Sequence, residues 1–79
     1  MKATLKIPRI SMNMQEATLR KWFKQPGESF EQGEALYEIE TEKVVNEVEA
    51  PAKGTLLEIM IEEDSECEVG DPVCRIQTE

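Results

Sequence analysis

Hydrophobic and polar residues alternate in several short stretches of this chain, and helical spacing lasts for only about two turns at best. At the start, Leu5 and Ile7 alternate with Thr4 and Lys6 until Pro8 ends the pattern. A period of two is typical of β-strands with one buried face, and proline ends such strands because it lacks an amide proton. We therefore expect a short edge strand at the beginning of the chain.

The strongest pattern lies in the middle of the sequence, where segments 35–41 and 44–49 predict the two strands of a β-hairpin. The residues expected to face the core are Tyr37, Ile39, Val44 and Val48. Only Glu42 and Lys43 stand between the two strands, which makes them the central positions of a four-residue turn. Lys43 would then lie at the tip of the hairpin.

The rest of the chain also favours an all-β fold. Two further strands are predicted at 56–61 and 73–77, and two connections at 28–33 and 62–70. The best helical candidate, 16–24, is cut off after about two turns by Pro26. Segment 9–15 has no clean periodicity and is interpreted as a surface loop, with Met12 and Met14 packed beneath it rather than forming a recognition patch.

The two halves of the chain repeat each other at an offset of 37 residues. The identical pairs are Thr18/Thr55, Leu19/Leu56, Glu31/Glu68, Gly33/Gly70, Ile39/Ile76, Thr41/Thr78 and Glu42/Glu79. Such self-similarity indicates one supersecondary unit used twice. We predict a single domain, 1–79, with half-repeats over about 1–42 and 44–79. Its two four-stranded antiparallel sheets would form a flattened β-barrel or sandwich with quasi-two-fold symmetry.

Composition excludes several classes of function. The chain has 79 residues, no histidine and a formal net charge of −8. A domain of this size holds a core too small for a large catalytic pocket, and its charge disfavours nucleic acid and anionic membranes as partners. No histidine-based catalysis or histidine-ligated metal site is available. The acidic run 62–66 lacks the spacing of a calcium loop, and we expect no metal.

Cysteine use and the N-terminal sequence bear on where the protein works. Cys67 and Cys74 are the two cysteines of the chain. They could form one disulfide, but free, partly buried thiols are the favoured interpretation for a reducing compartment. No apolar segment has the length of a signal peptide core or a membrane span. We therefore expect a cytoplasmic, monomeric domain.

Several short motifs together resemble the lipoyl domains of the 2-oxo acid dehydrogenase complexes, over essentially the whole chain. They are the Pro8-ended first strand, Glu16-Ala17-Thr18-Leu19, Trp22, Pro26-Gly27-Glu28, Gly33-Glu34, Glu38-Ile39-Glu40-Thr41-Glu42-Lys43, Ala50-Pro51, Gly54-Thr55 and Val69-Gly70. The family pattern around the modified lysine is Glu-Thr-Asp-Lys-Ala, so this chain departs from it at Glu42 and Val44. Both departures are mild, since a carboxylate still precedes the lysine and an apolar residue still follows it.

The resemblance implies that Lys43 is the attachment site of lipoic acid, flanked in its turn by Glu42 and Val44. The domain would be a non-catalytic carrier that can form part of a dihydrolipoamide acyltransferase chain, with Lys43 bearing a swinging arm. The implied partners are a lipoate ligase or lipoyl transferase, a thiamine-diphosphate-dependent decarboxylase, the acyltransferase core and dihydrolipoamide dehydrogenase. The complex served could act on a 2-oxo acid or on acetoin.

Two alternatives stay open at this point. A biotin carrier domain shares the fold and the hairpin lysine, but its usual flanks are methionines, whereas Lys43 stands between Glu42 and Val44. An unmodified β-sandwich, used only for interaction, would make Lys43 an ordinary turn residue. The glutamates of the two hairpin strands, from Glu38 to Glu49, could steer docking to basic surfaces or could simply be solvated. The loop 9–14 is a second candidate for partner recognition.

Overall fold

The computed structural model describes residues 1–9, 12, 15–41 and 44–78. Strands account for all the regular structure in this part of the chain, and no helix is present there. The strands are β1 (Lys2–Lys6), β2 (Glu16–Trp22), β3 (Ser29–Phe30), β4 (Ala35–Glu40), β5 (Val45–Glu49), β6 (Gly54–Ile59), β7 (Ser65–Glu68) and β8 (Pro72–Thr78). The all-β prediction is therefore confirmed.

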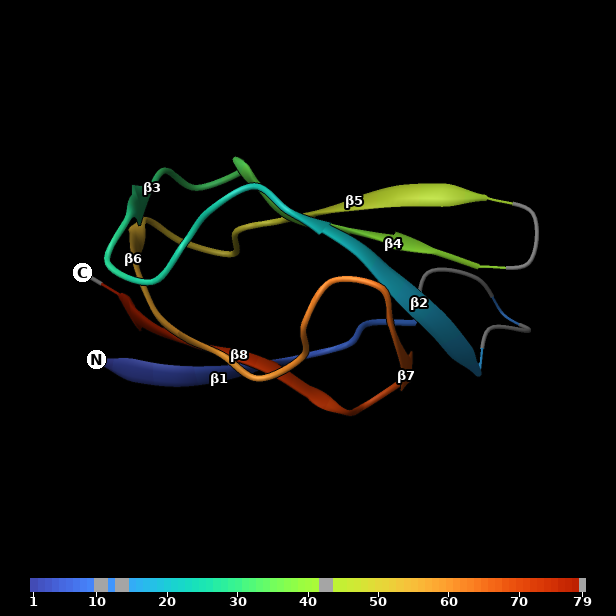
Figure 1. Ribbon diagram of the computed structural model, residues 1–79. Helices are drawn as coiled ribbons and strands as arrows, with labels where there is room; N and C mark the ends of the chain where they lie inside the picture. The colour runs from blue at the N-terminus through green and yellow to red at the C-terminus, as the bar shows by residue number, and fades with distance from the viewer. Residues whose placement is uncertain (10–11, 13–14, 42–43, 79) are drawn as a thin grey trace.

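The strands form two four-stranded antiparallel sheets, in the orders β1-β8-β6-β3 and β5-β4-β2-β7. The molecule is elongated, with principal extents of 34 × 21 × 17 Å. Figure 1 shows that the two ends of the chain lie together at one end of this long axis, while β4 and β5 run toward the other end. The hairpin strands and the chain ends therefore mark opposite tips of the molecule.

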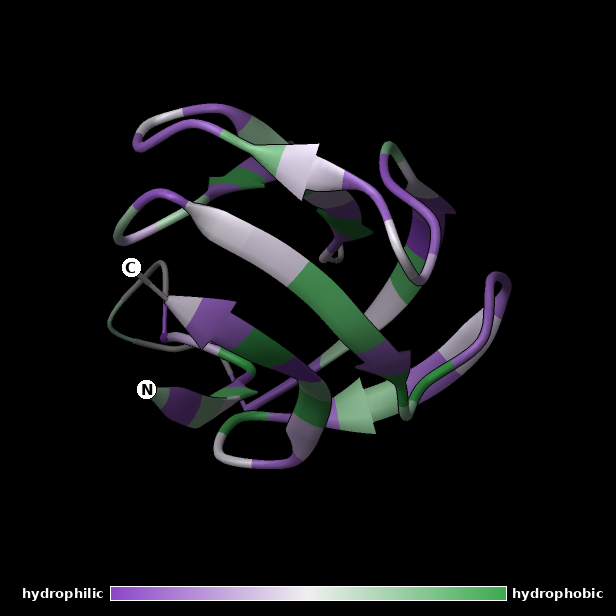
Figure 2. Ribbon diagram, turned by 90° about the vertical axis from the view of Figure 1, so that its left-hand side faces the viewer, coloured by the Kyte–Doolittle hydropathy of each residue, from purple (hydrophilic) through white to green (hydrophobic). Residues whose placement is uncertain are grey.

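One apolar core lies between the two sheets, as the alternation of each strand requires. Figure 2 shows hydrophobic and hydrophilic residues succeeding each other along the strands. The core residues buried most completely are Ile7, Leu19, Phe30, Leu36, Tyr37, Ile39, Leu56, Val73, Cys74 and Ile76. Both halves of the chain contribute to this core, so neither sheet can hide its apolar face without the other.

The strand pairing of the first half recurs in the second half at the offset of 37 residues. In the β2–β4 pair, Leu19 faces Ile39, and in the β6–β8 pair, Leu56 faces Ile76. Both pairs shift register directly after this leucine. Gly33 and Gly70 have φ angles of 86° and 94°, the left-handed conformation that glycine adopts without steric cost. The two sheets thus share one backbone plan with quasi-two-fold symmetry.

Several details differ from the prediction. The expected connections 28–33 and 62–70 contain the short strands β3 and β7, which are too brief for their alternation to be recognised. Val44 does not face the core, because the side chain is 52% exposed next to the hairpin end. Met12 is 90% exposed, so it does not pack beneath its loop. Met14 lies outside the described residues.

The cysteine prediction is confirmed. Cys67 and Cys74 are both free and both buried. The Cys67 thiol donates a hydrogen bond to the carbonyl oxygen of Ala17, at 3.4 Å. Burial raises the pKa of Cys67, and it raises the pKa of Cys74 to about 12. Both side chains therefore act as small apolar core residues.

Candidate functional site

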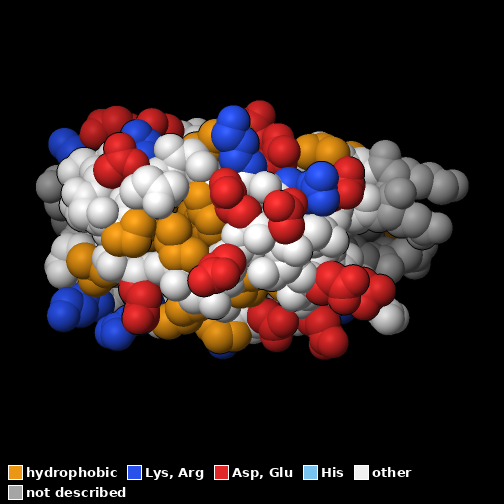
Figure 3. Space-filling view, in the orientation of Figure 1, with side chains coloured by type: hydrophobic (Ala, Val, Ile, Leu, Met, Phe, Trp, Pro, Cys, Tyr) orange, Lys and Arg blue, Asp and Glu red, His pale blue; other side chains and the backbone are white. Residues whose placement is uncertain are grey.

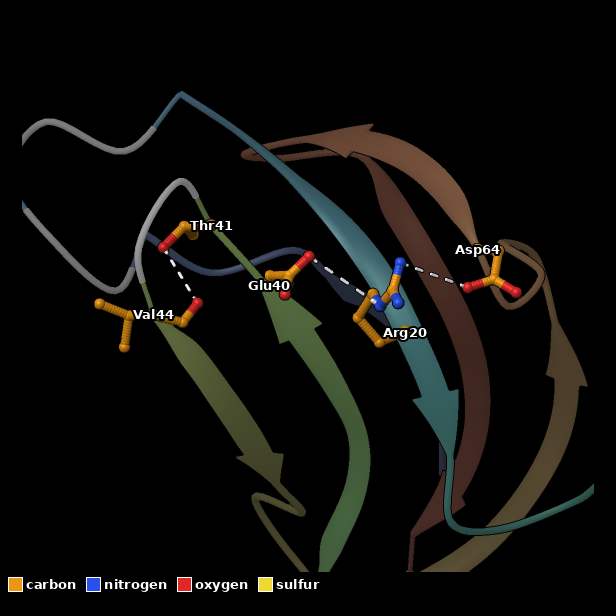
Figure 4. A network of polar contacts seen from close by, with 5 residues as sticks. All are labelled: Arg20, Glu40, Thr41, Val44 and Asp64. Atoms are coloured by element: carbon orange, nitrogen blue, oxygen red, sulfur yellow. Dashed lines mark hydrogen bonds and ion pairs between the residues drawn. The ribbon is translucent and has the colours of Figure 1, made fainter.

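The candidate site is the end of the β4–β5 hairpin. Within the hairpin, Glu40 pairs with Val45, and the next pair outward is Thr41 with Val44. The Thr41 amide donates a hydrogen bond to the Val44 carbonyl oxygen at 2.8 Å, and the Thr41 hydroxyl donates a second one to the same oxygen at 3.3 Å. Figure 4 shows this contact at the point where the two strands end.

The sequence places two residues between Thr41 and Val44, and these are the predicted site residues Glu42 and Lys43. Both lie outside the described residues, so their roles stay predictions. The third predicted site residue, Val44, is half-exposed, as is Val45 beside it. Two neighbouring valines are thus half-exposed at this end of the hairpin.

The strand that leads to the site is held from beneath by the core. Tyr37 and Ile39 of β4 are buried, and the Tyr37 ring lies 5.0 Å from the Trp22 ring, tilted by 48°. The Trp22 indole N–H donates to the Ile61 carbonyl at 2.9 Å, and its backbone amide donates to the Glu63 carboxylate at 2.9 Å. An aromatic pair stabilises a fold beyond the apolar area that it buries, so the inner face of β4 is well anchored in the core.

An arginine on the outer surface connects the end of β4 with the turn before β7. The Arg20 guanidinium lies 4.0 Å from the Glu40 carboxylate and 3.5 Å from the Asp64 carboxylate (Figure 4). Arg20 and Glu40 are each 46% exposed and Asp64 is 74% exposed. Solvated pairs of this kind contribute little to stability, so the arginine mainly sets the local charge near the hairpin end.

The outer face of the sheet β5-β4-β2-β7 carries several charged residues next to the site. Directly paired residues share a face, and two such rows cross this sheet. They are Val45, Glu40, Thr18 and Glu66 in one row, and Glu47, Glu38 and Lys21 in the other. In the view of Figure 3, acidic side chains are spread over the upper and the lower part of the molecule, with lysine and arginine among them. The site therefore stands at the edge of an acidic surface.

Other kinds of site find no support in the described part of the chain. There, no group of three or more cysteine, aspartate or glutamate side chains is placed to hold a metal ion. No helix within residues 1–9, 12, 15–41 and 44–78 could cross a membrane. Away from the hairpin, Lys24 and Glu34 form a partly buried ion pair at 2.9 Å, and this contact raises the pKa of the lysine and lowers that of the glutamate.

Sequence reasoning missed two residues of the hairpin end. The closing hydroxyl of Thr41 had a signal in the repeat, because Thr78 stands at the equivalent position. Arg20 had none, since its equivalent is Leu57 and its two partners are distant in sequence. A contact across three chain segments becomes visible only when the strand order is known.

The sequence is similar to a known protein family and to components of a dehydrogenase complex and of an acetoin cleaving system. A family profile described as "Biotin-requiring enzyme", covering biotin and lipoyl domains, matches residues 3–76. The chain is 45% identical over 76 residues to the dihydrolipoyllysine-residue succinyltransferase component of the 2-oxoglutarate dehydrogenase complex of Cupriavidus necator, covering 95% of this chain and 18% of that protein. It is 37% identical over 70 residues to the dihydrolipoyllysine-residue acetyltransferase component of the acetoin cleaving system of Bacillus subtilis, covering 89% of this chain and 18% of that protein.

Two solved structures have a similar fold. The lipoyl domain of the 2-oxoglutarate dehydrogenase complex from Azotobacter vinelandii superposes with a TM-score of 0.78 at 32% identity, covering 94% of each chain. A single-chain, multi-domain long-chain acyl-CoA carboxylase contains a region that superposes with a TM-score of 0.83 at 15% identity, covering 99% of this chain and 7% of that one. The second similarity concerns the fold alone.

Proposed function

This chain belongs to the lipoyl domains of the biotin and lipoyl attachment family, and we propose that it is a carrier domain whose Lys43 is covalently lipoylated. The amine of Lys43 would be joined through an amide bond to the carboxyl group of lipoic acid. When bound, this group supplies a dithiolane that accepts acyl groups and electrons. The protein's own part is to hold and present the lysine, which makes the domain a substrate carrier rather than a catalyst.

One observation carries the proposal: the hydrogen-bonded closure of the β4–β5 hairpin by Thr41 and Val44. Only Glu42 and Lys43 connect these two residues. The side chains of a two-residue hairpin connection lie beyond the last pair of the sheet, where a modifying enzyme can reach them. Paired strands with a buried base fix the origin of a flexible arm, so the arm can visit separate active sites from a defined point.

The flanks of the lysine support lipoic acid over biotin. Lys43 stands between Glu42 and Val44, whereas biotin carriers place methionines on both sides of the lysine. The 32% identity to a solved lipoyl domain supports the same choice. An unmodified interaction module is the remaining alternative, and it would leave the Thr41 closure as a purely structural feature.

The chain spans 18% of the length of the two relatives described above, so the activity of a larger protein is also a proposal. We infer that the domain serves an acyltransferase of a 2-oxo acid or acetoin dehydrogenase complex in the cytoplasm. Lys43 would carry its group among a thiamine-diphosphate-dependent decarboxylase, the acyltransferase core and dihydrolipoamide dehydrogenase. A lipoate ligase or lipoyl transferase would modify it, and the domain itself would be monomeric.

Intact-mass measurement tests the proposal. We expect the domain to gain one lipoyl increment when it is produced with a lipoate ligase and lipoic acid, and Lys43→Gln to abolish the gain. Lys6→Gln is the matched control, because Lys6 is an exposed lysine of the opposite sheet. A biotin increment with a biotin ligase would favour the carboxylase alternative. No increment with either competent ligase would leave the unmodified module.

A further inference from the structure

The hydroxyl of Thr41 has a role in the hairpin that its backbone does not supply. The Val44 carbonyl oxygen accepts two hydrogen bonds from Thr41, one from the amide at 2.8 Å and one from the hydroxyl at 3.3 Å. The hydrogen bond from the backbone amide would form with almost any residue at position 41. The hydroxyl bond is available only to threonine or serine among the common small residues. Thr41 therefore ties the end of β4 to the residue that follows Lys43 in sequence.

Thr78 makes the same contact at the opposite tip of the molecule. Its amide and its hydroxyl donate to the Met1 carbonyl oxygen at 2.7 and 3.0 Å, and the Met1 ammonium donates to the Thr78 carbonyl at 3.0 Å. The closure is thus a property of the fold and is used at both tips. At the hairpin tip the closed residues, Thr41 and Val44, are joined by the two-residue connection that contains Lys43, so there the closure can affect the proposed modification.

Among the described residues, few buried side chains hold the very end of the hairpin in place. Val44 and Val45 are 52% and 50% exposed, so neither anchors the strand end in the core. Glu40, the residue before Thr41, lies 4.0 Å from Arg20 in a solvated ion pair. Strand ends with few buried contacts open readily. The second hydrogen bond to the Val44 carbonyl therefore adds to the backbone pairing that keeps this end closed.

We propose that Thr41, through its hydroxyl group, is a positioning residue for the modification of Lys43. This inference rests on the proposed lipoyl function. By keeping the Thr41–Val44 pair closed, it would hold together the two ends of the connection that contains Lys43, and so lower what the ligase must order on binding. Ordering a segment on binding weakens the complex, whereas a preorganised segment avoids that loss. Loss of the hydroxyl should then raise KM for the domain and change kcat little.

Three substitutions test the proposal on the whole domain with a lipoate ligase. Thr41→Val keeps the shape of the side chain and removes the hydroxyl, and we expect KM to rise about three- to tenfold, which is the range that one hydrogen bond gives. Thr41→Ser restores the donor and should return KM to near the wild-type value. Thr78→Val is the matched control, since it removes the same bond at the opposite tip and should leave KM unchanged.

Amide hydrogen exchange gives a second readout that does not depend on the ligase. The Thr41 amide should exchange faster in Thr41→Val than in the wild type, while Thr78→Val leaves it unchanged. An unaltered KM and exchange rate in Thr41→Val would overturn the role of the hydroxyl, and so would an equal rise of KM in Thr78→Val, which would indicate general destabilisation. A wild-type domain that the ligase does not modify would instead overturn the proposed function.

Discussion

The two sheets have the same backbone plan, yet their outer faces differ in charge. On the sheet that carries the hairpin, one row of paired residues contains two glutamates, Glu40 and Glu66. The equivalent row on the other sheet contains no acid and one lysine, with the members Lys2, Gln77, Thr55 and Ser29. In the neighbouring rows, Glu38 of the first sheet is replaced by Arg75 in the second.

This difference separates what the fold requires from what a partner could require. The positions that face the core stay apolar in both halves, because each sheet needs the other to bury its inner face. The outward positions carry no such demand, and a change of charge there costs little stability. A duplicated backbone can therefore keep one core while its two outer faces acquire different surface properties.

The largest expected effect comes from the part that the two halves share. Leu19 and Leu56 are equivalent, and both are fully buried. We expect Leu19→Ala and Leu56→Ala each to lower the free energy of unfolding by about 2–5 kcal/mol, the usual range for such core truncations. Urea denaturation followed by far-ultraviolet circular dichroism and by fluorescence of Trp22 measures this. Two separate transitions, or an unchanged Trp22 transition in Leu56→Ala, would contradict a shared core.

A smaller effect should appear at alkaline pH, from two buried groups at equivalent positions. Burial raises the pKa of Cys74 to about 12 and also raises that of Tyr37. The folded state therefore favours the protonated forms, so their contribution is complete below pH 9 and is lost as pH rises toward the folded values. Each group should lower the free energy of unfolding by up to about 1.4 kcal/mol per pH unit in that range.

Removing one titrating group at a time checks the alkaline prediction. Urea denaturation of the wild type between pH 8 and 11 should show stability falling above pH 9, and Cys74→Val should make the fall shallower. Tyr37→Phe should do the same, with its effect beginning about one pH unit higher, in line with the ordinary pKa values of the two groups. Identical slopes in all three proteins would contradict the assignment of the alkaline loss to these side chains.

The repeat in the sequence predicted the general fold well. Alternation located the long strands β1, β4 and β8, and the repeat indicated two sheets even where single strands were not recognised. The strands β3 and β7 were missed because two and four residues do not establish a period. Val44 was placed inside because it is apolar, yet at the end of a hairpin the alternation no longer meets a partner sheet that could cover it.

The candidate site was predictable to a different degree. The sequence pointed to the hairpin and to Lys43 through its motif. Hydrogen bonds within the turn, such as that from the Thr41 hydroxyl, depend on a few tenths of an ångström and cannot be read from residue spacing. The contact of Arg20 with Glu40 and Asp64 joins three segments whose proximity follows from strand order. Such contacts follow only from the three-dimensional arrangement of the strands.

The smallest expected effect concerns the acidic outer face, and it tests the comparison most directly. Glu40→Gln combined with Glu47→Thr gives the hairpin sheet the residues that the other sheet carries at equivalent positions. If acidic residues steer the domain to a basic surface of its decarboxylase, association at low salt should slow by roughly threefold. Stopped-flow kinetics of the lipoylated domain measure the association rate. The difference between the variant and the wild type should vanish at about 1 M salt, where the Debye length is only about 3 Å.

A matched control decides between steering by this face and an effect of net charge alone. Thr4→Lys combined with Gln77→Lys changes the formal charge by the same two units, but on the opposite sheet. Both double variants alter only exposed or half-exposed positions, so their stabilities should stay within about 0.5 kcal/mol of the wild type. Slower association in the first variant alone would assign the steering to the hairpin face. Equal slowing in both would show that the outer faces differ in composition without differing in function.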